Sequence, residues 1–178
     1  MRFSSVFVLA SLVVSSFAST AADVKAAIAI IDANLNGLAN AVSTLPLVGG
    51  TLSQVLAIHT NAGPLIAASN KGAADAVNVS PKPLSVVDGR VILDSVQALE
   101  SNIYHTLDDI ADRSNIFSGF HVPAIPALIK QDLVNWNTAT LALGAGLIGS
   151  VPADLLGNVT AFTTRTAANF GAAIAAFP

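Results

Sequence analysis

The stretch Val24–Leu45, VKAAIAIIDANLNGLANAVSTL, decides the fold of this chain. Its large apolar residues recur at gaps that alternate between four and three positions. They are Val24, Ile28, Ile31, Leu35, Leu38, Val42 and Leu45. An α-helix makes one turn in about 3.6 residues, so this spacing places them on one face and predicts an amphipathic helix. Pro46 and the pair Gly49–Gly50 follow directly and predict where that helix ends.

A second helix is predicted to begin near Thr51, where apolar residues again recur at helical spacing. Gly63-Pro64 interrupts this pattern. Proline has no amide hydrogen and its ring collides with the preceding turn, so we expect a kink or a break at this point. A weaker helix is expected over residues 65–77, and residues 78–84, with two prolines, are expected to form a connection.

Three further helices are predicted. Residues 85–88, SVVD, match a capping box, and the helix that they start is expected to end near Arg113. A fourth helix is expected to start around Pro123 or Pro126, and a last one at residues 150–154, since proline is tolerated in a first turn. The apolar face of the fourth is predicted to contain Ile125, Leu128, Ile129, Leu133, Trp136, Leu141 and Leu147. The pattern predicts an all-α fold, an antiparallel bundle of about five amphipathic helices.

The N-terminus has the layout of a secretory signal peptide. A basic start and an apolar, uncharged run over residues 3–17 are followed by small residues. We predict a signal peptide over residues 1–18, with Ala21 as the alternative last residue before cleavage. The apolar run is shorter than the roughly 20 residues that a transmembrane helix requires. Residues 19–178 are therefore expected to form a single, secreted helical-bundle domain.

Secretion would expose two sequons to glycosylation. Asn78 and Asn158 each start an Asn-X-Ser/Thr triplet and are candidate glycosylation sites. Pro81 directly follows the first triplet and makes it the less favourable acceptor.

The composition excludes several classes of function. The chain of 178 residues has a net charge of −3, and 11% of its residues are charged while 53% are hydrophobic. Nucleic acid and anionic membrane surfaces are poor partners, because binding to phosphate requires clustered lysine and arginine. The chain contains no cysteine, so thiolate chemistry and cysteine metal sites are excluded. The domain is expected to be stabilised by packing alone.

No arrangement of catalytic residues stands out. The histidines are His59, His105 and His121, and none lies in the strand–turn–helix context of a nucleophile. His105 shares a helix face with the aspartates at 108, 109 and 112, but such a cluster is usually a solvated acidic surface rather than a metal site. We therefore expect no catalytic residue, metal or cofactor. An enzyme, of the hydrolase type, ranks third among the candidate functions.

Several predicted helices carry large aliphatic residues interleaved with Ala, Ser, Thr and Gly. Most of the large residues are accounted for by an ordinary core. The small ones leave room for a void or groove along the axis of a bundle, where ligands of bundles often bind. We expect long-chain fatty acids or similar ligands to bind there. The predicted walls are Leu99, Ile103, Leu107, Leu128, Leu133, Phe162, Phe170 and Ile174.

The connection over residues 114–122, SNIFSGFHV, is unusually apolar. Phe117 and Phe120 lie beside Gly119 in it. Because phenylalanine is usually buried, these side chains are expected either to plug one end of the bundle or to form a lid at its entrance.

Residues 147–155, LIGSVPADL, end one aliphatic helix and start the next, and Phe170 and Phe177 follow late in that last helix. In this order of features the chain resembles the fungal hydrophobic surface-binding proteins, whose domain is also found in cell-wall galactomannoproteins. The signal peptide, the absence of cysteine and the bias toward Ala, Ser, Thr and Leu agree with that family. The resemblance extends over nearly all of residues 19–178.

The resemblance implies a five-helix bundle, a secreted or wall-associated location and binding to hydrophobic surfaces. Some galactomannoprotein relatives resemble fatty-acid carriers with an internal apolar tunnel. We expect the chain to differ from them in having a single domain, no Ser/Thr-rich tail and no anchor signal. We therefore expect a secreted, non-enzymatic protein that binds hydrophobic surfaces or fatty-acid-like ligands, with cell-wall polysaccharide or secreted hydrolases as further candidate partners. The alternative is a structural cell-wall mannoprotein without a specific ligand.

Overall fold

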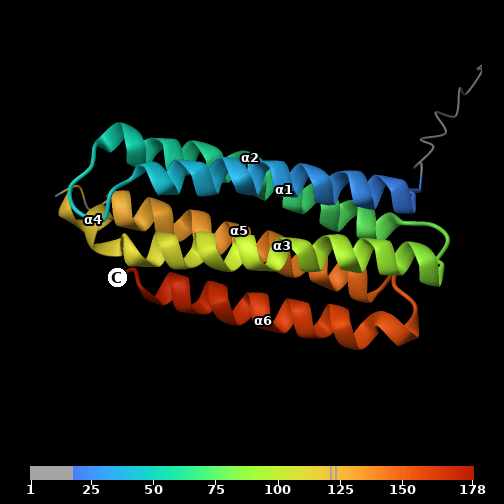
Figure 1. The fold of residues 1–178 in the computed structure, drawn as a ribbon. Helices are drawn as coiled ribbons and strands as arrows, with labels where there is room; N and C mark the ends of the chain where they lie inside the picture. Colours follow the sequence, from blue (N-terminus) through green and yellow to red (C-terminus); the bar gives the residue numbers. More distant parts are fainter. Residues whose placement is uncertain (1–17, 121, 123) are drawn as a thin grey trace, which may run out of the picture.

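A computed structural model describes residues 18–120, 122 and 124–178, and their secondary structure is helical. The helices are α1 (Ala21–Thr44), α2 (Leu52–Asn78), α3 (Val86–Asp112), α4 (Ser114–Gly119), α5 (Ala124–Ile148), the 3-10 helix η1 (Ala153–Leu155) and α6 (Leu156–Ala175). The long helices α1, α2, α3, α5 and α6 lie side by side along one axis (Figure 1). The predicted all-α bundle of five helices is confirmed. The predicted signal peptide lies outside the described residues, apart from its last position.

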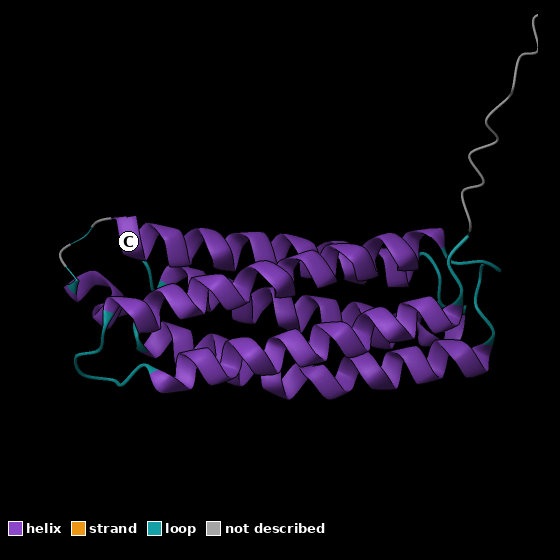
Figure 2. Ribbon diagram, turned by 90° about the horizontal axis from the view of Figure 1, so that it is seen from above, coloured by secondary structure: helices purple, strands orange, loops and turns teal. Residues whose placement is uncertain are grey.

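The long helices form a closed ring. α1 packs against α2, α2 against α5, α5 against α6, α6 against α3, and α3 against α1. Long helices that follow one another in the chain run antiparallel, as predicted, and Figure 2 shows them extending along the whole molecule. In a ring with an odd number of helices, neighbours cannot all run in opposite directions. One long helix separates the members of the pairs α1–α3, α2–α5 and α3–α6 in the chain, so the helices of each of these pairs are parallel.

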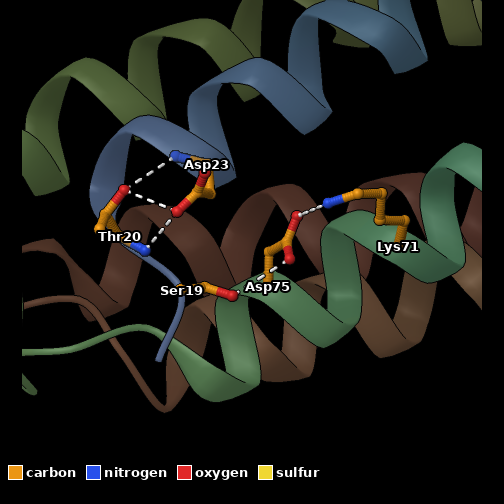
Figure 3. A network of polar contacts seen from close by, with 5 residues as sticks. All are labelled: Ser19, Thr20, Asp23, Lys71 and Asp75. Atoms are coloured by element: carbon orange, nitrogen blue, oxygen red, sulfur yellow. Dashed lines mark hydrogen bonds and ion pairs between the residues drawn. The ribbon is translucent and has the colours of Figure 1, made fainter. Parts of the chain in front are cut away.

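The start of α1 is fastened to α2 by the polar network in Figure 3. Thr20 caps α1 by accepting a hydrogen bond from the Asp23 N–H, and the Asp23 carboxylate accepts one from the Thr20 N–H at 2.8 Å. Ser19 Oγ donates to Asp75 of α2 at 3.1 Å, while Lys71 binds the same carboxylate at 2.6 Å. The predicted mature domain is thus part of the packed structure from its first residue.

α2 is continuous across Pro64, so of the two predicted outcomes, a kink or a break, the break is wrong. Thr51 and Gln54 form a capping box at its start. Pro64 lies on the exposed side of the helix, whereas its neighbours Ala62 and Leu65 are buried. The missing hydrogen bond and the proline ring therefore fall on the solvent side. Packing of the inner face against both α1 and α5 holds the helix together across this point.

The other helix boundaries agree with the prediction in most places. Ser85 caps α3, and α3 ends at Asp112, next to the expected Arg113. α5 begins at Ala124 with Pro126 in its first turn, and Pro123 lies outside the described residues. The connection after α3 is not simply a loop, because it contains the short helix α4. The last helix is preceded by η1 rather than starting directly at residues 150–154.

Candidate functional site

The long helices bury one face each inside the ring. All seven residues of the predicted α1 stripe are at most 4% exposed. Phe170 of α6 meets Trp136 of α5 edge to face, with ring centroids 4.8 Å apart. On α5, Leu143 is buried, whereas the predicted Leu141 is exposed. The stripe on α5 steps by three and four residues from Trp136 to Leu147, and this register passes through 143 rather than 141.

Small residues close the wall of the ring instead of leaving a groove along it. A Cβ atom on Gly146 of α5 would lie 3.1 Å from the backbone oxygen of Ala73 of α2. A Cβ atom on Gly144 would lie 2.5 Å from Thr163 Oγ1 of α6. At these positions the missing side chains allow α5 to approach both neighbours closely.

The interior contains a small apolar pocket of about 10 Å³. It is lined by Leu38 of α1, Ile58 and Ala62 of α2, Ile110 of α3, and Ile129, Asp132, Leu133 and Trp136 of α5. Because four of the long helices contribute side chains, the pocket lies in the shared interior of the ring. Its volume is close to that of one water molecule, about 10–15 Å³ by this measure. An alkyl chain therefore enters only when side chains or helices around the pocket move apart.

Asp132 is the charged member of this lining. Its Oδ2 lies 2.8 Å from Nδ1 of His59 on α2, whose imidazole N–H donates to the carboxylate. The Asp132 side chain is only 14% exposed, while that of His59 is 43% exposed. Burial raises the pKa of Asp132 above its ordinary value of 3.8, and the hydrogen bond from His59 opposes this rise. The pair lies between α2 and α5, where Asp132 is largely buried and His59 is partly exposed to the solvent.

Of the predicted wall residues, only Leu133 lines this pocket. Ile103, Leu107, Phe162 and Phe170 are buried in the core, and Leu128 and Ile174 are half-buried. Leu99 forms part of a separate, shallow groove of about 400 Å³ between α1 and α3. The role of these residues as ligand walls remains a prediction.

Sequence reasoning missed the contribution of α1 and α2 to the pocket, and it missed Asp132. A signal was present for Asp132, which lies three residues after Ile129 and four before Trp136. That spacing places it at the edge of the buried face of α5. An acidic residue at such a position marks a candidate polar group inside an apolar lining.

The two predicted entrance residues have different environments. Phe117 of α4 is fully buried and lies against Phe177, with ring centroids 5.7 Å apart. Phe120 is half-buried and lines an open cavity of about 200 Å³ together with Gly49, Gly50 and Ile116. This cavity lies where α4 meets the α1–α2 connection, at one end of the ring. The assignment of Phe117 and Phe120 as entrance residues is carried on as a prediction.

A polar cluster spans the seam between α3 and α6. Arg165 binds Glu100 through two hydrogen bonds of 2.6 and 2.8 Å, and Tyr104 also donates to Glu100. These bonds, the one from Arg165 above all, lower the pKa of Glu100 below its ordinary value. Burial raises the pKa of the Tyr104 hydroxyl. The cluster fastens the two helices together on the outside of the ring.

The remaining candidate residues lie on the surface or outside the described range. His105 is exposed, and His121 is not among the described residues. In the described part of the chain, no three His, Cys, Asp or Glu side chains gather in a way that would hold a metal ion. Asn78 and Asn158 are both exposed, as glycosylation would require. Among the described helices, none has the length and apolar character needed to cross a membrane.

A ring of five amphipathic helices around a small apolar pocket places the chain in the class of small helical-bundle proteins. The profile of one family in this class, hydrophobic surface binding protein A, matches residues 21–149. The chain therefore belongs to the hydrophobic surface binding protein A family, and the resemblance found in the sequence is confirmed. No curated protein sequence matches the chain.

Solved structures share the fold. AfMP4p in complex with palmitic acid aligns with a TM-score of 0.77 at 22% identity, over 89% of this chain and 99% of that one. Ligand-binding domain 1 of the Penicillium marneffei MP1 protein, complexed with arachidonic acids, gives 0.76 at 18% identity over 89% and 99%. Domain 2, complexed with multiple arachidonic acids, gives 0.74 at 20% identity over 88% and 94%. At this level of identity the likeness establishes the fold.

Proposed function

We propose that this protein is a secreted binding protein that takes up long-chain fatty acids or similar amphiphiles into the ring of five helices. The observation that carries the proposal is the apolar pocket to which four of the long helices contribute. It is supported by the fold that the chain shares with proteins solved in complex with palmitic and arachidonic acids.

The free-energy terms predict binding of moderate affinity and low selectivity. Burying about 14 methylene groups at about 0.8 kcal/mol each contributes about 11 kcal/mol. Immobilising the ligand costs about 4–15 kcal/mol, and separating packed side chains adds to this cost. The expected affinity for a fatty acid is therefore micromolar or weaker. Aliphatic contacts carry no directional information, so we expect little selectivity among chain types.

Trp136 provides the test, because it is the only tryptophan in the chain and lines the pocket. Titration with palmitate should change its fluorescence in a saturable manner, and native mass spectrometry should show the complex. Butyrate, which has the same head group and almost no chain, should have no effect. The absence of both a saturable signal and bound lipid would refute uptake into the ring.

Adsorption to hydrophobic surfaces is a second candidate, favoured by exposed apolar residues in the α1–α2 connection. Leu47 is 60% exposed and Val48 87%, at the end of the ring that also carries α4. We expect Leu47→Ser with Val48→Ser to weaken adsorption to octadecyl-coated beads and to leave palmitate uptake unchanged. Val86→Ser with Val87→Ser, at the opposite end, is the matched control. Equal adsorption of both double variants would exclude this end as the contact surface.

The proposal includes the absence of catalysis. Hydrolysis of ester and glycoside substrates is expected to stay at background, because within the described residues His59 bonds to Asp132 and to no serine or threonine hydroxyl, and His105 lies on the exposed surface. Activity that is lost in His59→Ala or His105→Ala, with the fold intact, would show a hydrolase instead. Failure of both lipid uptake and adsorption would favour the structural wall mannoprotein.

A further inference from the structure

We propose that the signal peptide is removed after Ala18 and not after Ala21, and that the α-ammonium group created on Ser19 becomes a structural charge of the domain, held at the C-terminal end of α2. This inference rests on the predicted signal peptide and is independent of the proposed lipid uptake. It adds the position of the processing site and a role for the amino group that processing creates.

Ser19 is bound to α2 and to the connection after it through both its backbone and its side chain. Its N–H donates to the Asn78 backbone oxygen at 3.1 Å, and its own backbone oxygen accepts from the Ser80 N–H at 2.8 Å. Its Oγ donates to Asp75 at 3.1 Å (Figure 3). Ala18, in contrast, is exposed. Among the described residues, the packed structure therefore begins at Ser19.

Cleavage after Ala21 fits the small-residue pattern of signal peptides as well as cleavage after Ala18 does, so the sequence leaves both sites open. The structure separates them. A cut after Ala21 would remove Ser19 with its bonds and Thr20 with the capping box of α1. It would also place the new cation in the first turn of α1, where the free N–H groups of a helix already carry positive partial charge.

Processing changes the chemistry of the Ser19 nitrogen. Hydrolysis of the Ala18–Ser19 bond consumes one water molecule, whose oxygen joins the new carboxylate of Ala18. Both protons of the water go to the Ser19 nitrogen, which becomes an ammonium group with three N–H donors in place of one. An α-amino group has an ordinary pKa of about 7.7–8.0, so at pH 6 this group is charged.

The end of α2 is a favourable place for this charge. The last carbonyl groups of a helix carry negative partial charge, and the Ser19 nitrogen lies at the carbonyl of Asn78, the last residue of α2. The last turn of α2 contains no basic side chain. Lys82 reaches back from the connection and donates to the Val77 oxygen. The ammonium group would thus be a second cation at this helix end.

The side chains around Ser19 also favour a positive charge. In Figure 3, two carboxylates face one lysine. Asp75 is largely buried and pairs with Lys71 at 2.6 Å. Hydrogen bonds from Thr20 lower the pKa of Asp23, and the charge of Lys71 adds to this effect. Only three covalent bonds separate the Ser19 nitrogen from its Oγ, which binds Asp75. The ammonium group therefore supplies the second positive charge beside two negative ones.

The first experiment identifies the processing site. The full chain is expressed with its leader in a secreting eukaryotic host, and the mass and N-terminal sequence of the released protein are determined. We expect Ser19 as the first residue. A released chain that begins at Ala22, or one that retains Ala18, would overturn the assigned site.

The second experiment tests the charge. The chain that starts at Ser19 is prepared with a free amino group and with this group acetylated by an N-terminal acetyltransferase, which leaves the lysines unmodified. Acetylation keeps the N–H that donates to Asn78 and removes the positive charge. At pH 6 the acetylated form should melt about 2–4 °C lower, as followed by circular dichroism. Equal melting temperatures would overturn the structural role of the ammonium group.

Asp75→Asn separates the effect of the carboxylate from that of the helix end. In this variant the shift caused by acetylation should fall by at least about half, because the carboxylate no longer attracts the ammonium group. Asp94→Asn, an exposed position on α3, makes the same change in net charge and should keep the full shift. An undiminished shift in Asp75→Asn would refute the pairing with Asp75.

A chain that starts at Ala22, released from a cleavable fusion, represents the alternative product. It lacks the Thr20 cap and the bonds of Ser19, so it should melt below the acetylated Ser19 chain. A melting temperature equal to that of the free Ser19 chain would show that the two residues add no stability and would overturn the inference. The palmitate titration of the Ser19 chain is a separate readout, so failure of the processing inference leaves the proposed uptake standing.

Discussion

Asp132 and Glu100 are two carboxylates whose contributions to stability have opposite signs. The folded state raises the pKa of Asp132 through burial and lowers that of Glu100 through the bonds from Arg165. The native protein therefore holds the Asp132 proton more tightly than the unfolded chain does, and the Glu100 proton less tightly. Ionised Asp132 reduces stability above its raised pKa, whereas Glu100 adds stability that is lost as pH falls through its lowered pKa.

Replacing each carboxyl group by an amide tests whether its ionised form stabilises or destabilises the folded state. Asp132→Asn should raise the melting temperature at neutral pH, and the gain should shrink as pH is lowered toward about 4. Glu100→Gln should lower the melting temperature at neutral pH, and this loss should persist down to about pH 4.5 and shrink only below it, as the pH falls through the lowered pKa of Glu100. Thermal unfolding followed by circular dichroism at several pH values checks both. Effects of the same sign in the two variants would contradict the opposite pKa shifts.

Arg113 ties two helix ends together. Its Nε donates to the backbone oxygen of Leu45 at 2.7 Å, and its Nη1 donates to Asp109 at 2.8 Å, although the residue is almost fully buried. Arg113→Met should cost about 2–3 kcal/mol in the free energy of unfolding, because the Leu45 oxygen loses a charged donor. Urea unfolding measures this cost. The exposed Arg90→Met should stay within about 0.5 kcal/mol, and an equally small effect at Arg113 would show that its bonds do not hold the end of the ring.

At the scale of the element, α2 contains two residues that disfavour its central turns. Gly63 has open space where a Cβ atom would lie, and Pro64 lies within the helix. Gly63→Ala should stabilise the protein by about 1 kcal/mol through helix propensity. Pro64→Ala should add about 1–3 kcal/mol by restoring a backbone donor, less the entropy regained by the unfolded chain. Loss of stability in Pro64→Ala would mean that the proline shapes the packing of α2 against its neighbours.

At the scale of the whole molecule, the ring has to expand if its pocket of about 10 Å³ is to hold an alkyl chain. The chain has no cysteine, so Glu100→Cys with Arg165→Cys introduces a unique pair across the α3–α6 seam. A short, reducible bismaleimide between them should reduce palmitate uptake at least about tenfold. Adsorption through Leu47 and Val48 should be unaffected. Cleavage of the linker should restore uptake, and the double variant before linking controls for the lost ion pair.

An unchanged uptake after cross-linking would contradict expansion at this seam. The ligand would then enter while α3 and α6 stay together. The next cross-link to test would join α1 and α3, which border the shallow groove.

The sequence by itself determined the five long helices and most of their buried faces, although Leu141 of α5 was predicted to be buried and is exposed. Helix periodicity and capping are local properties, so a stripe such as Val24–Leu45 and a start such as Ser85 are read from neighbouring positions. Family membership also followed from the order of such features. For the same reason the prediction failed where packing overrides a local signal, as at Pro64.

Only the tertiary structure decided the order of helices in the ring, the use of Gly144 and Gly146 for close approach, and the position of Asp132 beside His59. The physical reason is that these features depend on which helices become neighbours. His59 and Asp132 are 73 positions apart in the chain, and the glycines act on α2 and α6 rather than on their own helix. Periodicity places a side chain on a face, but the neighbour that this face meets is set by the packing of the whole ring.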